Sequence, residues 1–238
     1  MAKILTSSDS SLCVQFGDAI SEEINDRVRA FALAVEAARF PGVVELVPTY
    51  RSVTVHYRPE VVGYARLYEQ LTRVLTDLAP ATLPAPKTVS VPVLYGGAWG
   101  PDLGTVAALH GLSEEEVIAR HTAPEYRVYM LGFLPGFCYL GGLDERLATP
   151  RLSTPRVSIP AGSVGIAGAQ TGVYPLESPG GWQLIGRTPL RLYDPRRAQP
   201  ILLEAGMQLR FCPIDRETFE RLHRENYPEA YARGGERP

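Results

Sequence analysis

The chain has 238 residues, of which 45% are hydrophobic and 21% charged, and its formal net charge is −2 at pH 7. This composition excludes an intrinsically disordered chain, and the length allows one large core or two smaller ones. Because the net charge is slightly negative, the chain as a whole does not attract nucleic acid or anionic lipid. We therefore expect neither a nucleic-acid partner nor a membrane partner.

The three cysteines are Cys13, Cys138 and Cys212, and their wide spacing suits neither a disulfide framework nor a zinc site. The four histidines also lack metal-site spacing, so no metal centre is expected. The N-terminal residues contain no apolar run of signal-peptide length, and no window approaches the roughly 18 apolar residues of a membrane span. These features predict a cytoplasmic protein.

The first part of the chain alternates short apolar runs with segments of helical period. Apolar residues such as Ile24, Val28 and Phe31 fall on one face of a helix that starts near Ser21. The predicted elements are a strand at 12–16, a helix at 21–38, strands at 43–47 and 51–57, and a helix at 61–78.

This β-α-β-β-α order is typical of the ferredoxin-like α/β sandwich, whose final strand is either residues 88–94 or missing. A proline-rich segment at 78–87 then predicts a stiff connector. We place an N-terminal α/β domain at 1–86 and a second domain at 87–238.

The second domain begins with a strand and two helices, one starting at Asp102 and ending at Gly111, the next carrying a Ser113–Glu116 capping box. Short β-prone runs broken by glycine or proline follow from residue 126 to 212, which favours a closed β-barrel. A helix from Asp215 to about residue 226 and a short disordered tail complete the prediction. The fold class is therefore α+β.

Three glycine-rich stretches carry most of the functional information. They are GFLPGFCYLGG at 132–142, PAGSVGIAGAQTGVYP at 160–175 and SPGGWQLIGRTP at 178–189. None has the pattern of a phosphate-binding loop. Their glycines suit barrel corners, while their aromatic residues suit either core packing or an apolar pocket with polar groups at its rim.

Other chemistry-bearing side chains admit two interpretations each. Arg151, Arg156 and Arg187 could each grip a carboxylate or phosphate, or serve as ordinary surface or structural arginines. His121, near a helix C-terminus, could cap that helix or act in acid–base chemistry. The Cys138 thiol could belong to a site, but a buried and inert cysteine fits better.

Longer segments around these stretches resemble one family. They are YRVYMLGFLPGFCYLGGLDERLATPR, VSIPAGSVGIAGAQTGVYP and SPGGWQLIGRTPLRLYDP, and they are similar to the KipI family, also called the B subunit of 5-oxoprolinase (PxpB) or allophanate hydrolase subunit 1-like. Cys138 stands where the family usually has proline. The resemblance implies an N-terminal α/β domain and a cyclophilin-like barrel.

The resemblance also implies a function. It points to the B subunit of an ATP-dependent 5-oxoprolinase that converts 5-oxo-L-proline to L-glutamate, a subunit that is inactive alone. Its partners would be a second barrel subunit (PxpC or KipA-like) and a lactam-handling subunit (PxpA or LamB-YcsF-like), with ATP and Mg²⁺ serving the complex. The alternative is a KipI-type inhibitor of sensor histidine kinase autophosphorylation.

The expected site is a cleft between the three stretches that would bind a small lactam carboxylate or the partner barrel. Its aromatic residues would cover the substrate ring or the face of the partner barrel, and Gln170 would serve a carbonyl or amide. An arginine, Arg187 or the nearby Arg156, would hold the carboxylate or a phosphoryl oxygen. The predicted residues are Phe133, Gly136, Phe137, Tyr139, Arg156, Gln170, Tyr174, Trp182 and Arg187. No individual catalytic residue is assigned.

Overall fold

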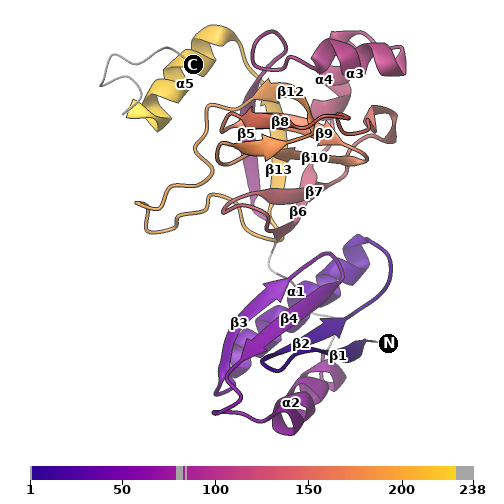
Figure 1. The fold of residues 1–238 in the computed structure, drawn as a ribbon, viewed down its shortest axis with the longest axis vertical. Coiled ribbons are helices and arrows are strands. Elements are labelled where there is room, and N and C mark those ends of the chain that lie inside the picture. The colour runs from indigo at the N-terminus through magenta and orange to yellow at the C-terminus, as the bar shows by residue number, and fades with distance from the viewer. Residues whose placement is uncertain (1, 79–82, 84, 229–238) are drawn as a thin grey trace. The chain divides into compact units, whose positions relative to one another are not determined.

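A computed structural model describes residues 2–78, 83 and 85–228 of the chain. The chain divides into two compact units, residues 1–85 and 86–238 (Figure 1). Half of the proline-rich connector, residues 79–82 and 84, and the whole tail predicted to be disordered lie outside the described residues. Within the described part of the chain, no helix is both long and apolar enough to cross a membrane.

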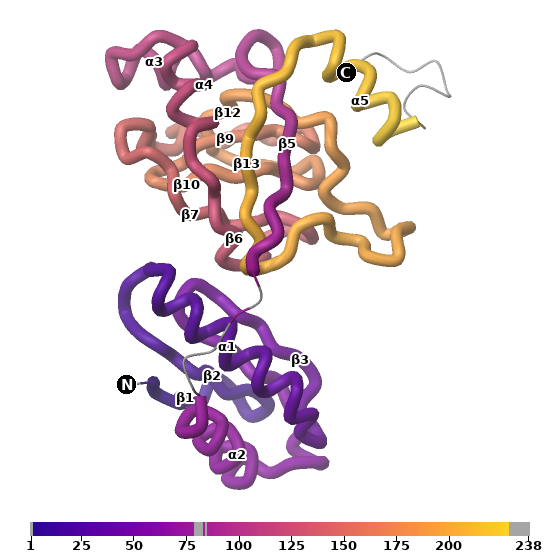
Figure 2. Tube along the Cα trace, turned by 180° about the vertical axis from the view of Figure 1, so that it is seen from behind, coloured from indigo at the N-terminus to yellow at the C-terminus, as the bar shows by residue number. Residues whose placement is uncertain are grey.

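The first unit is an antiparallel sheet with two helices. Its elements are β1 (Lys3–Ser8), β2 (Ser11–Gln15), α1 (Glu22–Ala38), β3 (Val43–Pro48), β4 (Ser52–Tyr57) and α2 (Tyr64–Thr76). The strand order is β1-β2-β4-β3. Figure 2 shows α1 lying along one face of this sheet.

Alternation along the central strands creates the core of this unit. Leu12 and Val14 of β2 and Val53 and Val55 of β4 are fully buried. They pack with the predicted helix stripe, in which Phe31 is also fully buried. The stripe therefore faces the sheet, as its spacing of three and four residues requires.

Two sequence predictions for this unit need correction. Strand β1 was not predicted, because this edge strand is mostly exposed and polar and so lacks an alternating pattern. Residues 88–94, considered as the last strand of the sandwich, belong instead to β5 in the sheet of the second unit. The edge position beside β2 is filled by β1, so the ferredoxin-like order is not confirmed.

The second unit is built on a seven-stranded sheet. In chain order its elements are β5 (Thr88–Tyr95), α3 (Leu103–His110), α4 (Glu114–Thr122), β6 (Tyr126–Leu131), β7 (Cys138–Gly141), the short 3₁₀ helix η1 (Glu145–Leu147), β8 (Arg156–Ile159), β9 (Ser163–Ala167), β10 (Gln170–Val173), β11 (Ser178–Gly180), β12 (Gln183–Arg187), β13 (Gln208–Pro213) and α5 (Arg216–Asn226). Strands β8 and β11 form a separate two-stranded ribbon.

The large sheet has the order β10-β9-β12-β5-β13-β6-β7, and β5 and β13 are parallel neighbours at its centre (Figure 2). Its two end strands, β7 and β10, lie against each other. Among the described residues these end strands form no hydrogen-bonded ladder. The predicted closed barrel is therefore a nearly closed, barrel-like sheet.

Helix boundaries in this unit follow local signals. Gly111 ends α3 in the left-handed conformation at φ 64°, and Ser113 and Glu116 form the predicted capping box of α4. Asp102 occupies the N-cap position of α3, but its carboxylate makes no capping hydrogen bond. That carboxylate has partners in the site described below.

A buried histidine links the helices to the sheet. The His121 side chain is fully buried, its Nδ1 lies 2.8 Å from Tyr95 Oη, and its Nε2 lies 2.8 Å from Thr171 Oγ1. Because the Thr171 hydroxyl donates to the Gly165 carbonyl, its oxygen accepts the Nε2 proton of His121. Nδ1 then accepts from Tyr95, and the neutral ring is satisfied on both sides. This network replaces both interpretations left open by the sequence, helix capping and acid–base chemistry.

Burial lowers the pKa of His121 to about 3, from 6.5 for a solvated imidazole. Between these values the unfolded chain binds a proton that the folded chain does not. Stability therefore falls as the pH falls below 6.5.

We predict that this histidine removes about 2 kcal/mol from the unfolding free energy of the second unit between pH 7 and pH 5. Trp99 and Trp182, the chain's two tryptophans, both lie in this unit, so urea unfolding followed by fluorescence reports on it. His121→Gln should show a correspondingly smaller loss over this pH range. Equal pH dependence in both proteins, or an NMR titration of the wild-type His121 ring above pH 5, would contradict the prediction.

Candidate functional site

The candidate site is a surface pocket of about 470 Å³ in the second unit. Loops and strand ends from three separate parts of this unit form its walls. The lining residues are Phe133, Phe137, Tyr139, Arg151, Pro155, Tyr174, Pro179, Gly180, Gly181 and Trp182. Five of the nine residues predicted from the sequence are among them.

Phe137 is the centre of an aromatic cluster. Its ring centroid lies 5.2 Å from Tyr139 and 5.6 Å from each of Phe133, Tyr174 and Trp182, and all four contacts are edge-to-face. Such contacts fix ring orientations in addition to burying apolar area. The pocket therefore has rigid, largely apolar walls.

A strained turn presents Phe133 at the rim. Its backbone φ is +67°, and the Leu134 N–H donates to the Gly132 carbonyl at 2.8 Å, which is the hydrogen bond of a γ-turn. The side chain is nevertheless 64% exposed. An exposed aromatic residue in a strained backbone conformation points to a functional constraint at this position.

Gly136 lies in the same loop as this turn and does not line the pocket. Its φ is +83°, which favours glycine, and a Cβ there would lie 3.3 Å from the Cβ of Tyr193. Gly136 therefore shapes the loop between β6 and β7.

Alternation along β7 separates the pocket from the main core. Phe137 and Tyr139 face the pocket, whereas Cys138 and Leu140 point into the core of the large sheet. Burial raises the pKa of the Cys138 thiol to about 12, so the thiol is not reactive at neutral pH.

Tyr174 contributes a protonated hydroxyl to the pocket. Burial raises the Tyr174 pKa to about 12, while the charges of Arg151 and Arg156 oppose this shift. A Cβ at Gly180 would lie 2.5 Å from Tyr174 Oη. Glycine is therefore required at position 180 for the hydroxyl to keep this place.

Arg156 supports the pocket from outside its wall. Its guanidinium donates to Asp102 Oδ1 at 2.7 Å and to the Trp182 carbonyl at 3.3 Å. The second carboxylate oxygen of Asp102 accepts the Leu184 N–H at 2.6 Å, and the Asp102 N–H donates to the Leu184 carbonyl at 2.9 Å. The Asp102–Arg156 pair therefore clamps the backbone on both sides of Gln183.

The two remaining predicted residues also lie away from the pocket wall. Arg187 lies in β12, where its Nε donates to the Ala161 carbonyl at 2.9 Å. Gln170 begins β10, where it pairs with Ala167 in the β9–β10 hairpin. The structure thus does not bring Gly136, Arg156, Gln170 or Arg187 to the pocket surface.

Five lining residues lie outside the predicted cleft. They are Arg151, which the sequence offered only as one of three candidate anion-binding arginines, and Pro155, Pro179, Gly180 and Gly181. Three of them lie in the SPGG run immediately before Trp182, so their position next to that aromatic residue in the sequence indicates that they belong to the pocket wall. Arg151 lies in an irregular loop, where neither helical nor strand period indicates which way a side chain points.

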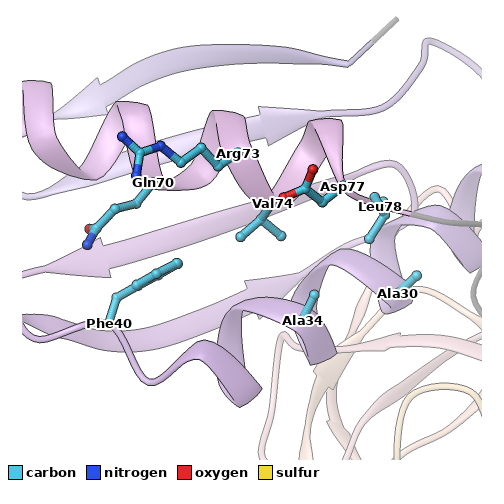
Figure 3. Close-up of a pocket in the computed structure, with 8 residues that line it drawn as sticks. All are labelled: Ala30, Ala34, Phe40, Gln70, Arg73, Val74, Asp77 and Leu78. Carbon is cyan, nitrogen blue, oxygen red and sulfur yellow. The ribbon is translucent and has the colours of Figure 1, made fainter.

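A second hollow, of about 550 Å³, lies between α1 and α2 of the first unit (Figure 3). Ala30 and Ala34 leave space on α1, and the charged residues Arg73 and Asp77 line it from α2 and its C-cap. The residues of the three glycine-rich stretches do not line it. The aromatic pocket, which these stretches do line, is therefore the candidate functional site.

We predict that Asp102→Asn makes the Trp182 side chain more mobile, because Arg156 loses its charged acceptor. The same substitution should lower the unfolding free energy by about 1–3 kcal/mol. The test measures Trp182 emission and urea unfolding in a Trp99→Phe background. Arg156→Lys is the matched comparison, since it keeps the charge but loses the forked geometry, and its effect should be smaller. Unchanged emission and an unchanged unfolding midpoint in Asp102→Asn would show that the clamp does not hold the tryptophan.

Comparisons with known proteins agree on one family. Residues 2–203 match the family described as "Carboxyltransferase domain, subdomain C and D". The 5-oxoprolinase B subunit of Bacillus subtilis is 46% identical over 92% of this chain and 95% of its own length. The 5-oxoprolinase B subunit of Escherichia coli is 50% identical over 78% of this chain and 84% of its own length.

A solved structure gives the same result. The crystal structure of TTHA0988 aligns with a TM-score of 0.77 and 40% identity over 86% of this chain, although this chain spans only 40% of that protein's length. The chain therefore belongs to the carboxyltransferase subdomain C and D family, within the group whose curated relatives are named as B subunits of 5-oxoprolinase.

Proposed function

We propose that this chain is the B subunit of an ATP-dependent 5-oxoprolinase, and that it contributes the aromatic pocket to a site shared with other subunits. The observation that carries the proposal is the 46% identity to a 5-oxoprolinase B subunit over nearly the whole length of both chains. The reaction would open the lactam of 5-oxo-L-proline to give L-glutamate, at the expense of ATP.

The chemistry of the pocket supports a subunit that does not act alone. Its lining residues offer aromatic rings, one guanidinium and tyrosine hydroxyls, but no carboxylate and no histidine. This set can bind and orient a small ring, yet it lacks a general base with a pKa near neutral. We infer that the remaining catalytic groups come from a second barrel subunit and a lactam-handling subunit.

The same lining does not fit ATP with Mg²⁺. Magnesium in nucleotide sites is usually held by carboxylates together with phosphate oxygens, and the pocket wall supplies no carboxylate. The phosphates would also meet only one cationic side chain, Arg151. We therefore place the nucleotide on a partner subunit.

Phe133 is the residue that we assign to subunit contact. It stands at the mouth of the pocket and exposes an aromatic ring that the folded chain alone does not cover. Aromatic residues are common energetic anchors in protein interfaces. Burial of this ring by the second barrel subunit would close the pocket over a bound substrate.

Reconstitution tests the proposed function. This chain alone, given 5-oxo-L-proline, Mg²⁺ and ATP, should release no glutamate, whereas the set with both partner subunits should release it. A complete and folded set of the three subunits that produces no glutamate would reject the proposal.

Copurification from the native cell provides a second test, because recovery of a sensor histidine kinase in place of the two metabolic subunits would favour the inhibitor function.

A substitution at the pocket mouth tests the assignment of Phe133. Phe133→Gly should change the unfolding free energy by no more than about 1 kcal/mol, because relief of the strained φ opposes the loss of the Phe133–Phe137 ring contact and the entropic cost of glycine. The same variant should bind the second barrel subunit about 5- to 10-fold more weakly, as calorimetry or sedimentation can measure.

The matched control is Leu109→Ala in α3. Leu109 is similarly exposed, at 57%, and does not line the pocket. Its loss should leave subunit affinity unchanged. Equal affinities for wild type and Phe133→Gly would remove Phe133 from the interface.

A further inference from the structure

The pocket contains an arginine without a carboxylate partner. Of the three arginines considered from the sequence, Arg156 pairs with Asp102 and Arg187 donates to the Ala161 carbonyl. Arg151 lines the pocket, and among the described residues it forms no ion pair with a carboxylate. Its exposed guanidinium is therefore available to a bound anion.

The backbone around Arg151 is held on both sides. The Pro150 carbonyl accepts a hydrogen bond from Gln183 Nε2 at 3.0 Å, and the Leu152 N–H donates to the Gly181 carbonyl at 2.7 Å. Both bonds connect the loop to the segment that carries Trp182. Arg151 and the aromatic wall are therefore positioned by the same backbone, which reduces the ordering required when a ligand binds.

A second donor lies in the same pocket. The Tyr174 side chain is buried, with a residue exposure of 2%, and within the described structure its hydroxyl makes no hydrogen bond. The Arg151 charge lies close enough to affect the ionisation of this hydroxyl. The hydroxyl borders the open pocket, so it can donate a hydrogen bond to a molecule bound there.

From these contacts we propose that Arg151 and Tyr174 recognise a small cyclic amide bearing a carboxylate, with Arg151 holding the carboxylate and the Tyr174 hydroxyl donating to the ring carbonyl. The edges of the surrounding aromatic rings would pack against the aliphatic part of the ligand ring. This assignment rests on the proposed function for the identity of the substrate. It replaces Arg187 and Arg156 with Arg151 as the carboxylate-binding arginine.

The first test uses the reconstituted complex. Arg151→Gln should raise the KM for 5-oxo-L-proline about 10- to 100-fold, because a charged, forked hydrogen-bond donor is lost, while kcat changes much less. Arg151→Lys should recover part of this loss, since lysine keeps the charge without the fork. Tyr174→Phe keeps the packed ring and should raise KM about 2- to 10-fold.

Arg146→Gln is the matched control, because Arg146 is also exposed, lies five residues earlier and does not line the pocket. Its KM should equal that of wild type. An active complex in which Arg151→Gln also has the wild-type KM would overturn the proposal.

The second test measures binding without turnover. In a Trp99→Phe background, Trp182 fluorescence is titrated with 5-oxo-L-proline and with 2-pyrrolidinone, which lacks the carboxylate, using the chain alone and with its partner subunits. The wild type should prefer 5-oxo-L-proline at least about tenfold, and Arg151→Gln should lose this preference.

If Arg151→Gln loses the preference for 5-oxo-L-proline but the wild-type complex releases no glutamate, the pocket assignment is supported and the proposed function is rejected. No saturable binding by the wild type in either form, or equal affinities for both probes, would overturn the pocket assignment.

Discussion

The pocket depends on one carboxylate, that of Asp102. One oxygen binds the Arg156 guanidinium and the other accepts the Leu184 N–H, while Arg156 also reaches the Trp182 carbonyl. A charged acceptor makes strong and directional hydrogen bonds, and it is costly to leave unpaired when shielded from water. These bonds connect the start of α3, the β8–β11 ribbon and β12. The position of Trp182, and through it the aromatic wall, follows from this pair.

Strand β7 gives the pocket a second source of rigidity. Phe137, which immediately precedes this strand, and Tyr139 face the pocket, whereas Cys138 and Leu140 face the interior of the large sheet. An aromatic residue held in this way cannot turn aside without disturbing the close-packed core. The shape of the pocket wall therefore depends on the packing of the core of the second unit.

Local patterns in the sequence were enough to predict some features and not others. Helical spacing around Phe31 placed the first helix, and the Ser113–Glu116 pair marked a helix start. Aromatic residues beside glycine, such as Phe133 and Phe137, predicted an apolar pocket, and both residues line one. The partners of Arg156 could not be predicted, because Asp102 lies 54 residues away and no periodicity connects the two. Strand β1 was missed for a related reason, since its exposed edge needs no apolar pattern.

The central pairing of β5 with β13 has a consequence for how the protein is made. These are the first and last strands of the second unit, and residues 88 and 208 face each other in the sheet. A ribosome must therefore synthesise nearly the whole chain before the middle of this sheet can form. The first unit contains all of its own strands within residues 3–57, so it can fold while the second unit is still waiting for its final strand. Until β13 has been synthesised, β5 has an unpaired edge. The chain is therefore most prone to aggregate while its second unit is incomplete.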